Sequence, residues 1–201
     1  MSDLLVAAMT RLLGAAAILL LAGGMATAEE MAVPVDTQVP LFLKILTFDR
    51  NLPSRAGDDV TIAIVYQRGF RDSLLVREAF VAAIASHPLT VGHLPVRCVD
   101  VDLDEAPDLA AALRRVSADV VYVAPLRAVP VASIAKATRA LRILSITGVP
   151  DYVRGGLAVG IDQRRGRSRI LVNREAERAE GVALSSQLLK LATLVGGRHG
   201  R

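Results

Sequence analysis

Cysteine, tryptophan and aromatic side chains in general are scarce in this sequence. Its 201 residues include one cysteine, Cys98, no tryptophan and only 3% aromatic residues. A lone cysteine excludes an intramolecular disulfide. The alternation around it, Val96-Arg97-Cys98-Val99, favours a buried small side chain over intermolecular pairing. With few rings for base stacking and a net charge of only +4, nucleic acid is not expected as a partner.

Residues 1–28 have the pattern of a cleavable secretory signal peptide. Arg11 precedes an uncharged apolar run at 12–22, and the small residues Ala26-Thr27-Ala28 follow it. This order is typical of a signal peptide, whereas a membrane-spanning helix needs roughly 20 apolar residues. The alternative is an uncleaved N-terminal anchor. We therefore expect an exported protein with one domain at 29–195 and a disordered tail at 196–201.

Apolar runs and helical patterns alternate along the rest of the chain. Continuous β-favouring runs occur at 60–66, 96–101, 120–124 and 144–147. The helical patterns begin with the one that starts at Val39, and others follow at 72–86, 107–115 and 131–141. Strands that alternate with helices across short connections indicate parallel pairing and helices on both faces of a sheet. The predicted fold class is α/β, with a mixed, mostly parallel central sheet.

A different pattern follows Pro150. Residues 157–162 and 169–173 are predicted to form a β-hairpin around a basic turn at 164–169. The arginines of this turn are expected to lie in solvent. Asn173 is predicted to cap a short helix, and a last helix is predicted from Ser185 through Leu194.

No motif in the sequence specifies a reaction. The three histidines, His87, His93 and His199, have no partner at metal-ligand spacing. No serine lies in a G-x-S-x-G elbow, and no glycine pair has the spacing of a phosphate-binding loop. The acidic run at 100–105 lacks the glycine and the terminal glutamate of a helix–loop–helix calcium site. We therefore predict no enzymatic activity, no metal and no cofactor.

The C-terminal third contains a distinctive order of elements. The strand RILVN at 169–173 is followed by a short helix, by Gly181 and by SSQLLKLA at 185–192. This order is similar to the motif that closes members of the YfiR-like family of periplasmic proteins: a strand, Asn, a short helix, Gly, and then S-x-Q-L-L-K/R-L-A. Segments 41–48 and 118–123 fit the same family, so the resemblance extends from about Val39 to Leu194.

Together with the signal peptide, this resemblance implies a periplasmic regulator and not an enzyme. YfiR-type proteins form dimers and contact the periplasmic part of an inner-membrane signalling protein that carries a cyclic-di-GMP-synthesising domain. Some members use disulfides for redox control, which a chain with only Cys98 cannot do within one molecule. Segment 48–51 (FDRN) also departs from the Trp-Pro pair of other relatives.

The candidate binding residues come mainly from the closing motif. They are Asn173, Ser185, Gln187 and Leu189, with Arg127 as a further candidate. The leucines of the predicted last helix fill more than one stripe, with three on one face, Leu184, Leu188 and Leu191. One stripe is expected to pack on the sheet and the other on a second subunit. The alternative is a helix buried entirely in its own core.

A second hypothesis is a small-ligand-binding protein that resembles half of a periplasmic solute-binding protein. In an open parallel sheet, ligands bind at the carboxyl ends of the strands. That edge is expected to include Gln67-Arg68, Asp102 and Pro125-Leu126-Arg127.

Overall fold

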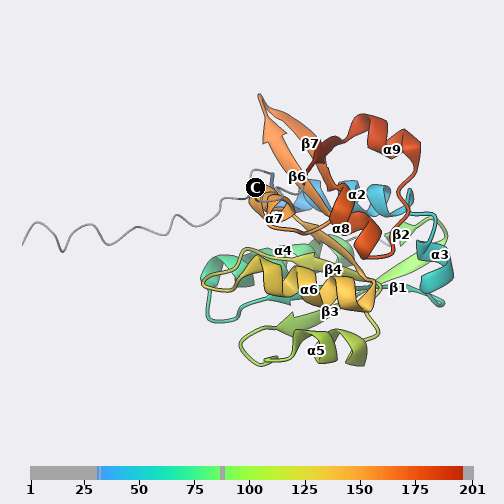
Figure 1. Cartoon of the computed structure of the whole chain (residues 1–201). Helices are drawn as coiled ribbons and strands as arrows, with labels where there is room; N and C mark the ends of the chain where they lie inside the picture. Colours follow the sequence, from blue (N-terminus) through green and yellow to red (C-terminus); the bar gives the residue numbers. More distant parts are fainter. Residues whose placement is uncertain (1–30, 32, 87–88, 197–201) are drawn as a thin grey trace, which may run out of the picture.

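The fold is seen in a computed structural model that describes residues 31, 33–86 and 89–196. The predicted signal peptide and, apart from Gly196, the predicted tail lie outside these residues. Eight strands form one sheet in the order β2-β3-β1-β4-β5-β6-β7-β8, and helices pack around it (Figure 1).

The sheet is mixed and mostly parallel, as the sequence predicts. β3, β1, β4, β5 and β6 are parallel neighbours, whereas β2 and β7 are antiparallel to β3 and β6, and β8 is parallel to β7. The strands are β1 (Val60–Tyr66), β2 (Thr90–Val91), β3 (Leu94–Asp102), β4 (Val120–Val123), β5 (Leu144–Thr147), β6 (Val159–Arg164), β7 (Arg167–Asn173) and β8 (Thr193–Val195).

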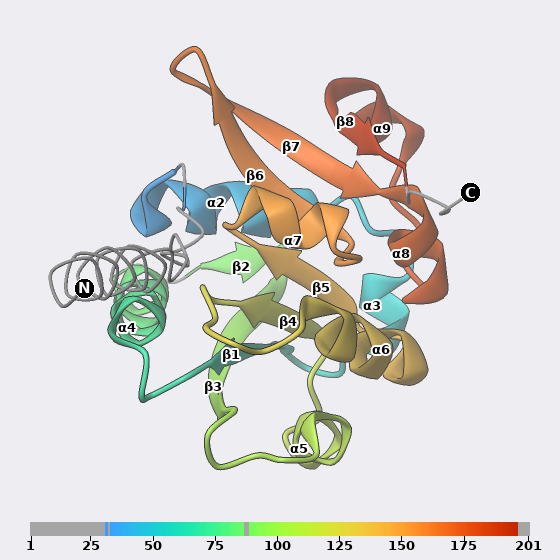
Figure 2. The ribbon, with the colours of Figure 1, turned by 60° about the vertical axis from the view of Figure 1, so that its left-hand side comes forward.

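Helices cover both faces of the sheet, which confirms the predicted α/β class. One face carries α2 and α4, and the other carries α5, α6 and α7 (Figure 2). The remaining helices are short: α3 follows α2, and α8 and α9 lie near β7 and β8. The helices are α2 (Val35–Leu46), α3 (Leu52–Arg55), α4 (Arg71–Ala85), α5 (Leu109–Arg115), α6 (Val131–Leu141), α7 (Pro150–Arg154), α8 (Arg174–Ala179) and α9 (Ser186–Leu191).

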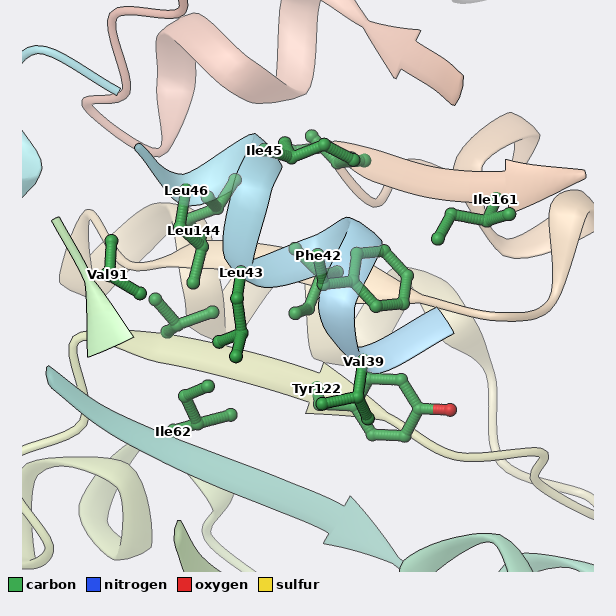
Figure 3. Close-up of a cluster of buried hydrophobic side chains, with 14 of the residues drawn as sticks. Val39, Phe42, Leu43, Ile45, Leu46, Ile62, Val91, Tyr122, Leu144 and Ile161 are labelled. Atoms are coloured by element: carbon green, nitrogen blue, oxygen red, sulfur yellow. The ribbon is translucent and has the colours of Figure 1, made fainter. Parts of the chain in front are cut away.

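The central strands β1, β4 and β5 are buried at every position because both of their faces are covered. In β1, Ile62 points into the core beneath α2, whereas its neighbour Ala63 points to the opposite core. Figure 3 shows Val39 and Phe42 of α2 directed at Tyr122 of β4. The rings of Phe42 and Tyr122 meet edge to face with centroids 5.9 Å apart.

Two helix starts differ from the prediction. α2 begins at Val35, four residues before Val39, so Pro40 lies inside the helix and not in its first turn. Pro40 has no N–H to donate to the carbonyl of Asp36, but both residues are exposed and water can replace that bond. α4 begins at Arg71, one residue before the predicted start at 72, and Phe70 is its N-cap residue.

The last helix is shorter than predicted. α9 ends at Leu191, Ala192 is extended with ψ of 152°, and Thr193–Val195 forms β8. The prediction of a helix through Leu194 is wrong. β7 offers an open edge there, and Thr193 and Val195 are β-branched and favour a strand.

The hairpin is longer and its turn tighter than predicted. The turn itself is only Arg165-Gly166, both with positive φ (51° and 74°), which is the geometry of a two-residue type I′ turn. The predicted basic turn at 164–169 is therefore wrong in extent. Arg164, Arg167 and Arg169 belong to β6 and β7.

Candidate functional site

Two buried carboxylates fix the path of the closing motif. Asp49, just after α2, accepts a hydrogen bond from Ala183 N at 3.0 Å and pairs with Arg55 at 2.8 Å. Glu177 of α8 accepts one from Leu184 N at 3.0 Å. Both carboxylates are almost fully buried, so the segment before α9 is held from two sides. Asp49 therefore acts as an anchor and not only as a local cap.

A third carboxylate, Glu180, ties the same segment to the sheet. It is fully buried and accepts from Thr138 Oγ1 at 2.7 Å, from Ser145 Oγ at 2.7 Å and from Ser145 N at 2.8 Å. Burial raises the pKa of Glu180 to about 7, against these hydrogen bonds, which lower it. The carboxyl therefore changes between its protonated and its ionised form near neutral pH.

The surroundings of Glu180 satisfy both of its protonation states. Thr138 Oγ1 also lies 3.1 Å from the carbonyl of Ala135. When the carboxyl is ionised, the Thr138 hydroxyl donates to it. When Glu180 Oε1 carries a proton, it donates to Thr138 Oγ1, and that hydroxyl turns to Ala135 O. One hydroxyl rotation is enough to keep every polar group paired.

Two of the candidate residues have structural roles. Asn173 is buried, accepts from Glu175 N and Ala176 N as the N-cap of α8, and donates through Nδ2 to Val153 O at 3.1 Å. The predicted cap is confirmed. Ser185 caps α9 by accepting from Leu188 N at 3.3 Å. Asn173 therefore positions α8, and Ser185 positions α9.

The other two residues of the motif lie on α9, one in solvent and one against the core. Gln187 is exposed, and Leu189 is half-buried against the core. Beyond them Leu191 is 75% exposed and Leu194 is 54% exposed. We call Gln187, Leu189, Leu191 and Leu194 the C-terminal edge surface.

One detail of the predicted leucine stripe is wrong. Leu184 and Leu188 are buried, as expected, but Leu191 points into solvent. Leu184 precedes the helix and is placed by its backbone bridge to Asp49. Leu191 is the last residue of α9, where the chain leaves the helix to enter β8.

Arg127 lies apart from the closing motif. It follows the carboxyl end of β4, whereas Glu180 reaches the amino end of β5 at Ser145. Its backbone N–H donates to Gln67 Oε1 at 2.7 Å, and its guanidinium lies 5.1 Å from the ring centre of Phe70. The five candidate residues therefore do not form one site.

Polar groups at the carboxyl ends of the strands mostly bond to one another. Arg68 Nε lies 3.0 Å from Asp102 Oδ2, and its backbone N–H donates to Asp102 Oδ1 at 3.2 Å. Asp104 accepts from Gly69 N at 2.8 Å. Gln67 spans the gap between the loops after β1 and β4. This edge is therefore tied together by the protein's own side chains.

The described residues offer little for metal or thiol chemistry. Among them, no three His, Cys, Asp or Glu side chains come together in a group suited to a metal ion. Cys98 is half-buried in β3, and burial together with the charge of Asp100 raises the pKa of its thiol to about 11. No helix in the described part of the chain is long and apolar enough to span a membrane.

A comparison with models of protein families finds a match that covers both the sheet and the closing motif. The model of the family described as YfiR/HmsC-like matches residues 40–193, from α2 to β8. The chain belongs to the YfiR/HmsC-like family. Membership points to a periplasmic regulator, because the family is regulatory and non-catalytic. A search of curated proteins found no match.

Solved structures share the fold at low sequence identity. A conserved domain protein from Vibrio cholerae matches with a TM-score of 0.56 and 16% identity over 80% of this chain and 60% of that one. An ABC domain in complex with L-Trp from Streptococcus pneumonia has a TM-score of 0.56 and 13% identity, over 81% of this chain and 62% of that one.

A substrate binding protein with adhesive properties from Clostridium difficile, in its ligand-free open form, is also similar. Its TM-score is 0.51 and its identity 16%, over 74% of this chain and 58% of that one. The YfiR/HmsC-like chain thus spans about 60% of the length of these structures. At such identities the likeness concerns the fold alone.

Glu177 and Glu180 are the residues that the sequence analysis missed. Glutamate side chains are usually exposed, and no local pattern in the sequence marks either of these two as buried. Which hydrogen-bond donors they meet depends on α6 and β5, which are distant in the sequence.

Proposed function

We propose that this YfiR/HmsC-like chain is a periplasmic regulatory protein that binds the periplasmic part of an inner-membrane signalling protein, a diguanylate cyclase, and modulates it. The observation that carries the proposal is the family match over nearly all of the described domain. The proposal contains no catalytic step, and docking alone changes the output of the partner.

The C-terminal edge surface is the proposed contact with the partner. Leu191 and Leu194 expose large apolar side chains on neighbouring elements, and such exposure is typical of protein contacts. Gln187 and Leu189 adjoin them on α9. The anchors at Asp49 and Glu180 support the assignment, since a surface that is held rigidly loses little entropy on binding.

The test compares two exposed leucines in a cell that produces the partner. Deletion of the gene should raise cyclic-di-GMP, and re-expression of the wild-type chain should restore the basal level. L191D should fail to restore it, because a carboxylate would be buried in the contact. L75D is the matched control, since Leu75 lies on α4, distant from the C-terminal edge surface, and is 49% exposed.

Three results would contradict the proposal. An unchanged cyclic-di-GMP level in the deletion strain would exclude a diguanylate cyclase as the partner. Full restoration by L191D would exclude the C-terminal edge surface as the contact. Equal failure of L75D would show that loss of any exposed leucine, and not this contact, is responsible.

The proposal includes a homodimer. Within the described residues β8 pairs on one side only, with β7, and its other edge is free to pair with the same strand of a second copy. Light scattering of the purified protein should give twice the mass of the chain, and a monomeric mass at all concentrations would exclude the dimer.

A small ligand is the second candidate. The fold is similar to those of an L-Trp complex and a substrate binding protein, and Arg127 lies at the edge where such a ligand would bind. A thermal-shift screen against amino acids and vitamins tests this, since a ligand that binds the native state raises its stability. No shift across the panel would count against a ligand.

A further inference from the structure

The strongest concentration of unpaired charge lies at the tip of the β6–β7 hairpin. In the described part of the chain, Arg164, Arg165 and Arg167 form no ion pair, whereas Arg169 at the base of the tip pairs with Asp162. The three unpaired arginines are exposed. They and Gly166 occupy four consecutive positions, so three positive charges lie within one tight turn.

The tip extends away from the body of the protein. β5 ends at Thr147, which pairs with Gly160, and β6 continues to Arg164 without a neighbour on that side. Four further residues of strand correspond to about 13 Å at about 3.3 Å per residue. Figures 1 and 2 show the hairpin projecting beyond the surrounding helices. A flat surface can therefore contact the tip before it meets any other part of the chain.

The tip holds its charges at a cost in stability. Arg164 and Arg167 are directly opposite each other across the hairpin, and like charges in that position repel. Arg165 has φ of +51°, at a position that favours Asn or Gly. A hairpin selected only for stability would place other residues at all three positions. An anion bound at the tip would remove the repulsion.

The composition of the tip favours a membrane surface over a protein partner. The turn and its flanks, residues 164–168, contain three arginines, a glycine and a serine and no apolar side chain. Protein contacts usually bury an apolar centre, whereas anionic lipids attract clustered basic residues by charge alone. Guanidinium groups also bind phosphate oxygens in a two-pronged manner.

We propose that the arginine tip of the β6–β7 hairpin binds the anionic phospholipid headgroups of a membrane surface. Binding is reversible and electrostatic, with no insertion into the bilayer. The proposal is independent of the C-terminal edge surface and of the identity of any protein partner. It adds a second contact, which would hold the protein at the membrane where its proposed partner resides.

Flotation of the purified full chain with lipid vesicles tests this proposal. At low salt, the wild type should float with vesicles of phosphatidylcholine containing about 30% phosphatidylglycerol and not with phosphatidylcholine alone. Each arginine contributes about fivefold to partitioning, so R164Q/R165Q/R167Q should reduce it on the order of a hundredfold. Moderate salt should release the wild type.

A matched variant separates the tip from net charge. R71Q/R114Q/R115Q removes the same three charges from exposed positions on α4 and α5 and should keep most of the binding. Loss of binding in this control to the same extent would overturn the proposal. The tip variant should melt at or above the wild-type temperature, because it removes the cross-strand repulsion, and this checks that it is folded.

Two further measurements distinguish phospholipid headgroups from other anionic ligands. Inorganic phosphate should release the protein from vesicles no better than chloride of equal ionic strength, and better release would show a site for free phosphate instead. A labelled polyglutamate peptide should bind no more tightly than the vesicles do. Tip-dependent binding to the peptide without binding to vesicles would overturn the lipid assignment in favour of an acidic protein segment.

Discussion

Glu180 offers the sharpest test of how the closing motif is held. The substitution E180Q keeps the size and shape of the side chain but fixes it in a neutral state. In the wild type the carboxyl is buried among Thr138 and Ser145, and its pKa is raised to about 7 from an ordinary value of 4.5. The variant should therefore differ from the wild type by an amount that depends on pH.

The sign and size follow from the two pKa values. Because the folded chain binds the Glu180 proton more tightly than the unfolded chain does, this stabilising effect is complete below about pH 4.5 and is lost as the pH rises to about 7. A shift of this size corresponds to about 3 kcal/mol at about 1.4 kcal/mol per unit. Between about pH 5 and about pH 8, the wild type should lose about 2 to 3 kcal/mol relative to E180Q.

Urea unfolding followed by circular dichroism, at several pH values, gives the free energies of unfolding. The difference between wild type and E180Q cancels the titration of the other carboxylates and of the histidines. E175Q is the control: Glu175 lies on the same helix, α8, and is exposed. The loss of about 2 to 3 kcal/mol should be seen relative to E180Q and not relative to E175Q.

A flat difference for E180Q would refute the reasoning. If that difference changes by less than about 0.5 kcal/mol over this pH range, Glu180 has a similar pKa in the folded and unfolded chains. The three hydrogen bonds would then balance the effect of burial. A slope of opposite sign would mean that the ionised form is the preferred buried state.

Two further predictions concern the core and the cysteine. A Cβ at Gly148 would lie far inside van der Waals contact with the Gln38 amide, so G148A should destabilise the protein by about 2 kcal/mol in urea unfolding. In a Q38A variant, the same G148A substitution should cost almost nothing. Equal costs with and without Q38A would contradict this steric explanation. Because the pKa of Cys98 is raised to about 11, its thiol should react slowly with a disulfide reagent at neutral pH in the folded chain and rapidly once urea unfolds the chain. An equally fast reaction of the folded chain would show that the folded chain holds a thiolate.

The periodic part of the fold could be predicted from the sequence. α6 and β5 have the predicted bounds, and α5 begins after Asp108, whose side chain accepts from Ala111 N. Local signals mark the ends of these elements. The short elements α3, α7 and β2 were not predicted, because segments of two to five residues carry too little periodicity.

The candidate site was only partly within reach of the sequence. The family resemblance directed the choice of candidate residues to the closing motif, and the Asn173 cap follows from local chemistry. The exposure of Leu191 and the strand at Leu194 could not be predicted from the sequence, because both depend on the open edge of β7. The extent of the arginine hairpin was also missed, since strand pairing continues up to Arg164 and Arg167.

The sequence by itself determined the α/β class, the order of the central strands along the chain and the family. Apolar runs, helix periods and a closing motif are local properties, and each can be recognised within a few residues. The tertiary structure alone decided which charges are buried and which are displayed. Glu180 is buried because α6 and β5 supply its donors, whereas Arg164 and Arg167 remain exposed because β6 extends beyond β5. Both outcomes depend on contacts between distant segments, which no local pattern encodes.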